Sequence, residues 1–335
     1  MKRKLPENTE YIDFHTHMHD KAFDLDSDAV TQSIINKNIT IVTIGTDIVE
    51  SRKAKALSDK YFLSGNENIF YTIGVHPHDD MNARFDESNE KDFEELLYAL
   101  DKNGNKIKNK MCIAIGECGL DYFYLKGDKE KGLIENMDRE VDKQKDIFIN
   151  QIKFAIMHDL PLMIHGRCSP QDDIDNPTGM DAYEDIIFIL EKFYKKNKIN
   201  GNVHFFVGDI NIAQRFIDLG FTFSFGGVLT LTHDYDEVVK YIPLEYIHAE
   251  TDSPYVTPKD KEGNKMENKI NTEEILALKN LTEKEIKDIH KKNKYRNSSE
   301  NINIIVAKIA ELKNLEIEFV KEKLKENFES FLSRE

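Results

Sequence analysis

Residues 11–17 read Tyr11-Ile12-Asp13-Phe14-His15-Thr16-His17, an apolar run that ends in two histidines one residue apart. Apolar and aromatic residues over this length, bounded by polar ones, predict a short buried strand. Similar runs recur along the chain, and segments with helical spacing separate them. The eight expected strands are Tyr11–Phe14, Ile39–Ile44, Ile69–Val75, Met111–Ile115, Leu160–Ile164, Asn202–Phe206, Phe221–Phe225 and Tyr246–Glu250.

The segments between these runs are amphipathic. In residues 141–158, for example, Phe148, Ile152 and Ala155 fall on one helical face. Eight successive βα units predict an α/β fold of the (β/α)8 TIM-barrel type. A doubly wound open sheet would show the same alternation, but no Gly-x-Gly-x-x-Gly motif follows the first strand, so its dinucleotide-binding form has little support.

The rest of the chain fits one barrel. A length of 335 residues allows either two domains or one large barrel. Because there is no interior linker or internal repeat, we expect a single domain over residues 1–335 with a core of about 11–332. Helical patterns at 302–312 and 317–331 predict two C-terminal helices packed on the barrel wall.

Three connections are longer than a barrel needs, and each follows an expected strand. We therefore expect extended loops at the C-terminal mouth, where active sites of such barrels form. Their polar composition suits lids and tolerated insertions equally well. The three connections are residues 123–140, 168–180 and 259–273.

Composition limits the function. The chain carries 61 acidic and 46 basic residues, a net charge of −15, which excludes a globally basic nucleic-acid binder. Three cysteines without Cys-x-x-Cys spacing exclude a disulfide framework and a cysteine zinc cluster. No apolar run approaches the roughly 20 residues that cross a bilayer, and no apolar signal segment follows the first residues. We expect a cytoplasmic protein without membrane contact, and a nuclear one would look the same.

Histidines and carboxylates gather at the strand ends. His15 and His17 alternate on one strand, so their side chains point to the same side about 6.6 Å apart and can bind one metal or two adjacent metals. In a barrel, the other strand ends bring further polar groups to the same mouth, where burial is costly unless cations satisfy them. These groups are His76, His78, Glu117, His165, His204 and Asp252; His19, His158, His233 and His290 are expected to be structural or solvated.

Six ordered motifs make the chain similar to the TatD family of metal-dependent deoxyribonucleases, in the amidohydrolase superfamily. The resemblance runs from Ile12 to about Phe328. Its motifs are Asp13-Phe14-His15-Thr16-His17, Gly74-Val75-His76-Pro77-His78, Gly116-Glu117-Cys118-Gly119-Leu120-Asp121-Tyr122, Ile164-His165-Gly166-Arg167, His204-Phe205-Phe206-Val207-Gly208 and Glu250-Thr251-Asp252-Ser253-Pro254-Tyr255.

The resemblance implies hydrolysis of DNA phosphodiester bonds, often from a 3′ end, by a hydrolase that acts on ester bonds. Val207 and Ser299 depart from the usual family pattern, which leaves substrate preference open. The implied metal ligands are His15, His17, Glu117, His165, His204 and Asp252.

Phosphodiester cleavage at such a site uses two cations about 3.5–4 Å apart, which clamp the attacking and leaving oxygens and activate a water. We expect Glu117 to bridge the two metals. Asp252 would also orient that water or accept its proton. One metal is assigned to His15, His17 and Asp252, and the other to His165 and His204.

Two further residues are candidates for contact with the scissile phosphate. His76 offers an imidazole donor, which would make it catalytic alongside Glu117 and Asp252, and Arg167 offers a planar cation. Either could instead orient a metal ligand. Asp121 and Tyr122 are expected to support the loop after the fourth strand, and His78 is a secondary candidate.

The expected cofactors are two divalent ions. An imidazole-rich site suits Zn²⁺, Mn²⁺ or Fe²⁺, whereas Mg²⁺ commonly supports nucleases of this resemblance. The expected partner is a short segment of DNA near a strand end, held through metal-mediated phosphate contacts, and no obligate protein partner is evident. Two lysine clusters precede strands and should lie at the opposite face: Lys102, Lys106, Lys108 and Lys110, and Lys192, Lys195, Lys196 and Lys198.

Two other functions remain open. The first is a hydrolase of the same superfamily that acts on a small amide, lactone or phosphoester. Those relatives commonly bridge their metals with a modified lysine at the fourth strand, where this chain has Glu117. The second is a non-catalytic binding protein stabilised by metal, although a structural site normally closes with four ligands and this chain offers six.

Overall fold

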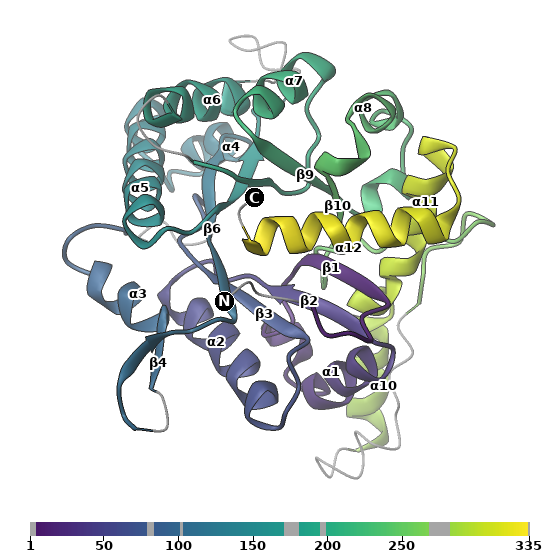
Figure 1. Ribbon diagram of the computed structural model, residues 1–335. Coiled ribbons are helices and arrows are strands. Elements are labelled where there is room, and N and C mark those ends of the chain that lie inside the picture. Colours follow the sequence, from purple (N-terminus) through teal and green to yellow (C-terminus); the bar gives the residue numbers. More distant parts are fainter. Residues whose placement is uncertain are drawn as a thin grey trace.

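Eight parallel strands form a nearly closed barrel surrounded by helices (Figure 1). The computed structural model describes residues 5–78, 84–100, 103–170, 181–194, 199–267 and 282–333. Neighbouring strands follow the order β1-β2-β3-β6-β7-β8-β9-β10. The predicted TIM-barrel fold is thereby confirmed. The barrel strands are β1 (Tyr11–Thr16), β2 (Ile39–Thr43), β3 (Ile69–Ile73), β6 (Cys112–Asp121), β7 (Leu162–Arg167), β8 (Gly201–Val203), β9 (Phe221–Phe225) and β10 (Ile247–Ala249).

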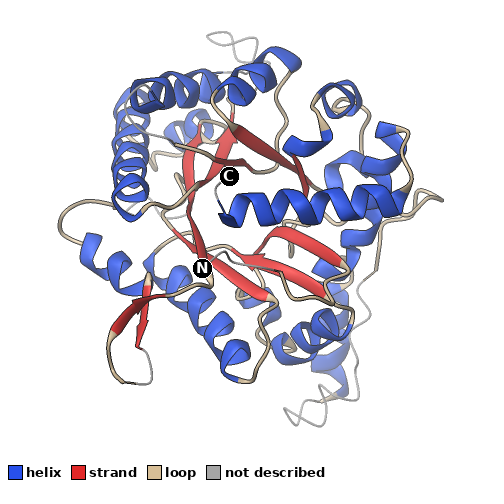
Figure 2. Cartoon of the chain, viewed as in Figure 1, coloured by secondary structure: helices blue, strands red, loops and turns tan. Residues whose placement is uncertain are grey.

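Each predicted strand overlaps one of these. β6 is much longer than the expected strand. Its pairing with β7 continues to the partners Asp121 and Arg167, well beyond the expected end at Ile115. An antiparallel hairpin of β4 (Tyr98–Leu100) and β5 (Lys106–Lys108) was not predicted, and it lies outside the barrel at the lower left of Figure 2.

Hydrogen bonds between β1 and the chain after β10 close the barrel at its carboxyl end. The Asp252 N–H donates to the His15 carbonyl over 2.9 Å, and the His17 N–H donates to the Ser253 carbonyl over 2.7 Å. The carboxylate of Asp13 accepts the Thr251 N–H over 2.8 Å. The first and last strand ends, both rich in candidate ligands, are therefore held side by side.

Helices form the outer layer of the barrel. The long α5 buries Phe148, Ile152 and Ala155 against the strands, as its amphipathic pattern predicts. The helices are α1 (Ser27–Asn36), α2 (Ile48–Leu63), α3 (Glu90–Leu96), α4 (Leu125–Glu130), α5 (Met137–His158), α6 (Asp181–Tyr194), α7 (Ile210–Asp218), α8 (Asp236–Tyr241), α10 (Glu283–Asn293), α11 (Ile302–Lys313) and α12 (Ile317–Ser333), with short 3-10 turns at Lys21–Phe23, Gly227–Thr230, Leu244–Tyr246 and Ser299–Asn301.

The two predicted C-terminal helices differ in position. α11 packs on the wall beside α8, as expected, but α12 lies across the amino end of the barrel (Figure 1). Its Asn327 side chain donates to the carbonyls of Leu244 and Ile247, at the start of β10, over 2.8 Å each. Its Phe328 and Phe331 rings meet Phe14 edge-on. α12 therefore closes the amino end because its aromatic face covers the apolar barrel interior.

The expected long loops belong only in part to the described residues. The connection 123–140 is not a loop throughout, because it contains α4 and the start of α5. Of the connections 168–180 and 259–273, only 168–170 and 259–267 belong to the described residues. Within the described part of the chain, no helix has the length and apolar character to cross a membrane.

The lysine clusters are also described only in part. Lys108 donates to the carbonyl of His158 over 2.6 Å, which places it beside the end of α5 that is away from the mouth. Lys110 forms an ion pair with Glu67 over 2.6 Å. Four cluster lysines lie outside the described residues: Lys102, Lys195, Lys196 and Lys198.

Candidate metal centre

β6 carries Glu117 into the middle of the barrel mouth. Two glycines flank it and allow β6 to pass very close to β7. A Cβ added to Gly116, whose φ is +152°, would lie 2.3 Å from the Met163 carbonyl oxygen, and one added to Gly119, whose φ is +136°, would lie 2.0 Å from that of His165. Only glycine fits these positions. The Gly-Glu-Cys-Gly pattern is thus a requirement of the backbone that holds Glu117.

The two carboxylate oxygens of Glu117 face two different pairs of histidines. Oε1 lies 2.8 Å from His165 Nδ1 and 2.7 Å from His204 Nε2. Oε2 lies 3.4 Å from His15 Nε2 and 3.9 Å from His17 Nε2. One buried carboxylate therefore stands between two groups of nitrogen donors.

Asp252 and His76 extend these two groups. Asp252 Oδ1 lies 3.4 Å from His17 Nε2 and 3.8 Å from His15 Nε2, so it joins the Oε2 side. His76 Nε2 lies 3.6 Å from Glu117 Oε1 and joins the other side. Three sets offer donor atoms within 4.8 Å of one another: His15, His204 and Asp252; His15, His17 and Glu117; and His76, Glu117 and His165.

The spacing of the nitrogen atoms fits a metal site. His15 Nε2 and His17 Nε2 are 3.3 Å apart, and His165 Nδ1 and His204 Nε2 are 3.2 Å apart. A tetrahedral Zn²⁺ with nitrogen ligands at 2.0–2.1 Å would separate them by about 3.3 Å. Neutral imidazole nitrogens and carboxylate oxygens are also the donors that such ions take. The residues present are therefore suited to hold divalent cations.

Two carboxylates that the sequence analysis did not assign to the cluster contact its histidines. Asp121 was expected to support the loop, and its Oδ1 does accept the Phe123 N–H over 3.0 Å. Its Oδ2 also lies 3.1 Å from His165 Nε2. Glu250 Oε1 accepts the Phe205 N–H over 2.7 Å and lies 3.6 Å from His204 Nδ1. Strand alternation from Asp252 to Glu250 was the signal that could have identified the second carboxylate.

Burial and charge act in opposite directions in this cluster. Burial favours the neutral form of Glu117, but the imidazoles of His204, His76 and His15 outweigh it and hold the Glu117 pKa well below its usual value. Burial likewise lowers the pKa of His165, but hydrogen bonds with Asp121 and Glu117 outweigh it and raise the pKa to about 9. Glu117 is therefore ionised at neutral pH.

Comparison with known proteins matches almost the whole barrel. A family profile described as TatD related DNase matches residues 12–333. The chain belongs to the TatD family. A metal-dependent hydrolase of Buchnera aphidicola, described as uncharacterized, is 30% identical over 262 residues, which cover 75% of this chain and 84% of that protein. A Bacillus subtilis protein of the same description is 29% identical over 291 residues, covering 85% and 97%.

Solved structures of TatD proteins share the barrel. A crystal structure of an Escherichia coli TatD homologue aligns with a TM-score of 0.66 and 19% identity, covering 97% of this chain and 98% of the other. A TatD family hydrolase from Entamoeba histolytica aligns with a TM-score of 0.66 and 20% identity, covering 97% and 99%. The chain is thus a TatD-family metal-dependent hydrolase with the fold of these proteins.

The mouth of this TatD-family barrel is a cavity of about 730 Å³. Arg167 lies at its side, with the guanidinium carbon 3.8 Å from the Phe123 ring centroid, and donates to the Tyr124 hydroxyl over 3.0 Å. His78, the secondary candidate, stacks on Tyr124 and contacts Asp128 of α4 over 2.8 Å. His78 thus connects α4 to the rim of the cavity.

The histidines expected to be structural or solvated lie apart from the Glu117 contacts. His19 is buried with Nδ1 2.7 Å from Thr43 Oγ1, although it also lines the cavity. His158 packs on Phe154 at the end of α5, and His233 is exposed. The side chain of His290 lies outside the described residues.

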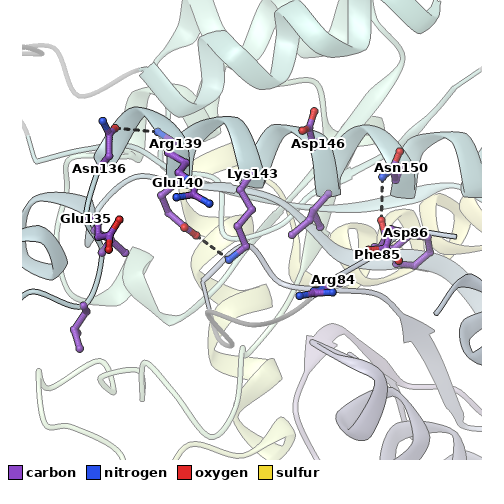
Figure 3. A pocket seen from close by; sticks show the side chains of 13 residues that line it. Arg84, Phe85, Asp86, Glu135, Asn136, Arg139, Glu140, Lys143, Asp146 and Asn150 are labelled. Carbon is purple, nitrogen blue, oxygen red and sulfur yellow. Dashed lines mark hydrogen bonds and ion pairs between the residues drawn. The ribbon is translucent and has the colours of Figure 1, made fainter. Parts of the chain in front are cut away.

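A second cavity of about 800 Å³ lies along α5 (Figure 3). Its lining mixes charges of both signs, with Arg139 and Lys143 beside Glu140 on the same helix. Lys143 pairs with Glu140 over 3.2 Å. All the predicted site residues except the fully buried His15 line the mouth instead, so the mouth is the candidate functional site.

Proposed function

We propose that this chain is a deoxyribonuclease that uses two divalent cations to hydrolyse phosphodiester bonds of DNA, releasing nucleotides from a 3′ end. The observation that carries the proposal is the position of Glu117, whose Oε1 faces His165 and His204 and whose Oε2 faces His15 and His17. A bridging carboxylate between two donor groups suits the paired cations of phosphodiester hydrolysis. Membership of a family described as TatD related DNase supports DNA as the substrate.

We assign the ligands by the contacts of Glu117. His15, His17 and Asp252 would hold one cation and His165 and His204 the other, with Glu117 offering an oxygen to each group. When bound, Zn²⁺, Mn²⁺ or Mg²⁺ ions supply Lewis acidity, which lowers the pKa of an attacking water and stabilises charge on the phosphate. Asp121 and Glu250 orient His165 and His204 through the contacts of their carboxylates.

Three residues of the chain act on the substrate. Asp252 orients the attacking water and accepts its proton at a carboxylate oxygen. His76, at the edge of the cluster and lining the cavity, donates to a phosphate oxygen. Arg167 makes the second phosphate contact, because its described contacts are with Phe123 and Tyr124 rather than with a candidate ligand, and its planar cation suits two phosphate oxygens.

The size of the mouth limits how much DNA it takes. A cavity of about 730 Å³ is in the range that holds a small ligand. The net charge of −15 also opposes an extended DNA track. We infer that the enzyme holds a few nucleotides near an end, so the salt dependence of DNA binding corresponds to only a few phosphate contacts.

The deciding experiment measures release of nucleotides from DNA labelled at either end, with Zn²⁺, Mn²⁺ or Mg²⁺ supplied in turn. Wild type is expected to shorten the strand from its 3′ end, and Glu117→Gln to lose about 1000-fold or more in rate, because the bridging charge is gone. Glu237→Gln, an exposed change on α8, is the matched control. Hydrolysis of amides, lactones or small phosphoesters but not of DNA would favour the alternative superfamily activity and overturn the proposal.

A further inference from the structure

The segment that carries Asp252, residues 251–256, has an unusual backbone. It follows β10, and two of its residues have a positive φ, Asp252 at +51° and Val256 at +43°. For a β-branched residue such as Val256 this left-handed conformation is rare and costly. It persists only where surrounding contacts hold the chain in place. The contacts of residues 251–256 therefore decide where the Asp252 carboxylate lies.

The first strand holds one side of this segment. The Asp252 N–H donates to the His15 carbonyl over 2.9 Å, which is one of the contacts that close the barrel. The next residue is held through its side chain, because Ser253 Oγ lies 2.6 Å from Thr16 Oγ1. These contacts fix the beginning of the segment to β1, up to Ser253.

Asn297 holds the same segment from a distant part of the chain. It lies between α10 and α11 and is fully buried. Its Nδ2 donates to the carbonyls of Thr251 and Tyr255 over 2.8 Å each. Its backbone N–H donates to the Pro254 carbonyl over 3.0 Å. Thr251 and Tyr255 immediately precede the two residues with a positive φ. One side chain thus binds the backbone at both left-handed positions.

The neighbours of Asn297 fix the direction of its amide. Its Oδ1 accepts the backbone N–H of Ser298 over 2.8 Å and the side-chain amide of Asn301 over 2.9 Å. A backbone N–H only donates and a carbonyl only accepts, so one orientation of the amide satisfies all these partners. The preceding Arg296 donates twice to the buried carboxylate of Asp26, over 2.8 and 2.6 Å. The donor that holds residues 251–256 is therefore itself ordered in advance.

We propose that Asn297 is a positioning residue for Asp252, which holds the carboxylate against His17 and thereby sets the affinity for the cation on that side of Glu117. The inference rests on the proposed role of Asp252 as a ligand. Asp252 Oδ1 lies 3.4 Å from His17 Nε2, and a displacement of about 1 Å is enough to impair a site of this kind. The Asn297 side chain bonds the backbone of the segment and not the cluster, so it acts through Asp252.

The test measures Zn²⁺ affinity by competition with a chelating dye, which needs no turnover. Asn297→Ala should lower the affinity for one of two Zn²⁺ ions by about 10- to 100-fold, and Asp252→Ala should weaken the same ion. In the double variant, Asn297→Ala should cost less than about threefold more, because the carboxylate through which it acts is already gone. Ser298→Ala is the matched control, since Ser298 is also buried but caps the turn at Ser299–Asn301.

A milder variant keeps the proposal testable if Asn297→Ala does not fold, which urea unfolding shows. Asn301→Ala removes the side chain that donates to Asn297 Oδ1 and leaves the two donations to residues 251–256 in place. It should therefore weaken the same Zn²⁺ ion by a smaller factor, about 2- to 5-fold. Unchanged affinity for both ions in folded Asn301→Ala protein would then count against the positioning role of Asn297 and overturn it.

The outcomes distinguish this role from the nuclease activity. If Asn297→Ala weakens Zn²⁺ binding equally with and without the Asp252 carboxylate, or equally for both ions, the positioning role is wrong, whatever the protein does to DNA. If the two substitutions are coupled as expected but wild type hydrolyses no DNA, the nuclease proposal is overturned and the positioning role stands. Unchanged Zn²⁺ affinity in Asp252→Ala would overturn the ligand assignment and the positioning role together.

Discussion

The two ends of the barrel use the same strands for opposite chemistry. At the carboxyl end, His15 is fully buried with its Nε2 3.4 Å from Glu117. At the amino end, His248 is 2% exposed and stacks on Phe14, with centroids 4.0 Å apart, under the Phe331 ring of α12. Two equally buried histidines thus have an anionic neighbour in one case and aromatic neighbours in the other. Burial alone therefore does not identify a histidine as a metal ligand. The chemistry of the neighbouring side chain, anionic or aromatic, distinguishes the two.

The electrostatics of the two ends differ accordingly. Burial lowers the pKa of His248 to about 3, so this ring is neutral at physiological pH. At the mouth, contacts with Asp121 and Glu117 overcome the effect of burial and raise the pKa of His165 to about 9. Burial alone thus sets the pKa of His248, whereas neighbouring carboxylates set that of His165.

The largest expected difference between the two ends is in catalysis. His15→Asn should lower kcat/KM on DNA by about 1000-fold, because it removes a proposed ligand and with it several kcal/mol of transition-state stabilisation. His248→Asn should change kcat/KM by less than about threefold per folded molecule. Steady-state kinetics on the two purified variants test this. Similar losses in both would contradict the division of the barrel into a catalytic and a structural end.

The converse experiment removes an aromatic ring from the amino end. Phe328 is fully buried and meets Phe14 and Phe70 edge-on, so Phe328→Ala should lower the free energy of unfolding by about 3–5 kcal/mol. Phe319→Ala, an exposed change on the same helix, should cost little. Urea unfolding measures both. Loss of metal binding in still-folded Phe328→Ala protein would show that the two ends are not independent.

A smaller effect, on metal affinity, is expected from a residue that contacts a proposed metal ligand. Asp121→Asn keeps the size of the side chain but removes the charge beside His165 Nε2, so the affinity for Zn²⁺ should fall about 10- to 100-fold. Asp218→Asn, an exposed change on α7, is the control. Competition with a chelating dye measures the affinity. An unchanged affinity for Asp121→Asn would mean that Asp121 serves only the Phe123 turn.

The smallest expected effect is on the pH dependence of stability. The pKa of His248 is lowered on folding, so the unfolded chain binds the proton first, and stability falls as the pH drops from about 6.5 towards about 3. Between pH 6.5 and 5.5 this residue should cost about 1 kcal/mol. Urea unfolding of wild type and His248→Phe at both pH values measures the difference. If the free energy of unfolding falls equally between the two pH values in both proteins, other groups than His248 cause the loss of stability in acid.

The sequence predicted much of the fold because its signals are local. Each of the eight strands was visible as a short apolar run between helical segments. The end of β6 was missed because its last residues are ordered by pairing with β7 across the Gly119 approach. The position of α12 was missed because an amphipathic pattern shows that a helix has an apolar face, but not which surface covers it.

The sequence by itself also determined that the His15 and His17 pair, Glu117 and Asp252 lie near the carboxyl side of their strands, since strand alternation and chain order are properties of the sequence. Only the tertiary structure decided that the two oxygens of Glu117 divide the histidines into two groups. Distances across a barrel depend on how the sheet closes, and closure depends on contacts between residues far apart in the chain, such as those between Asp252 and His15.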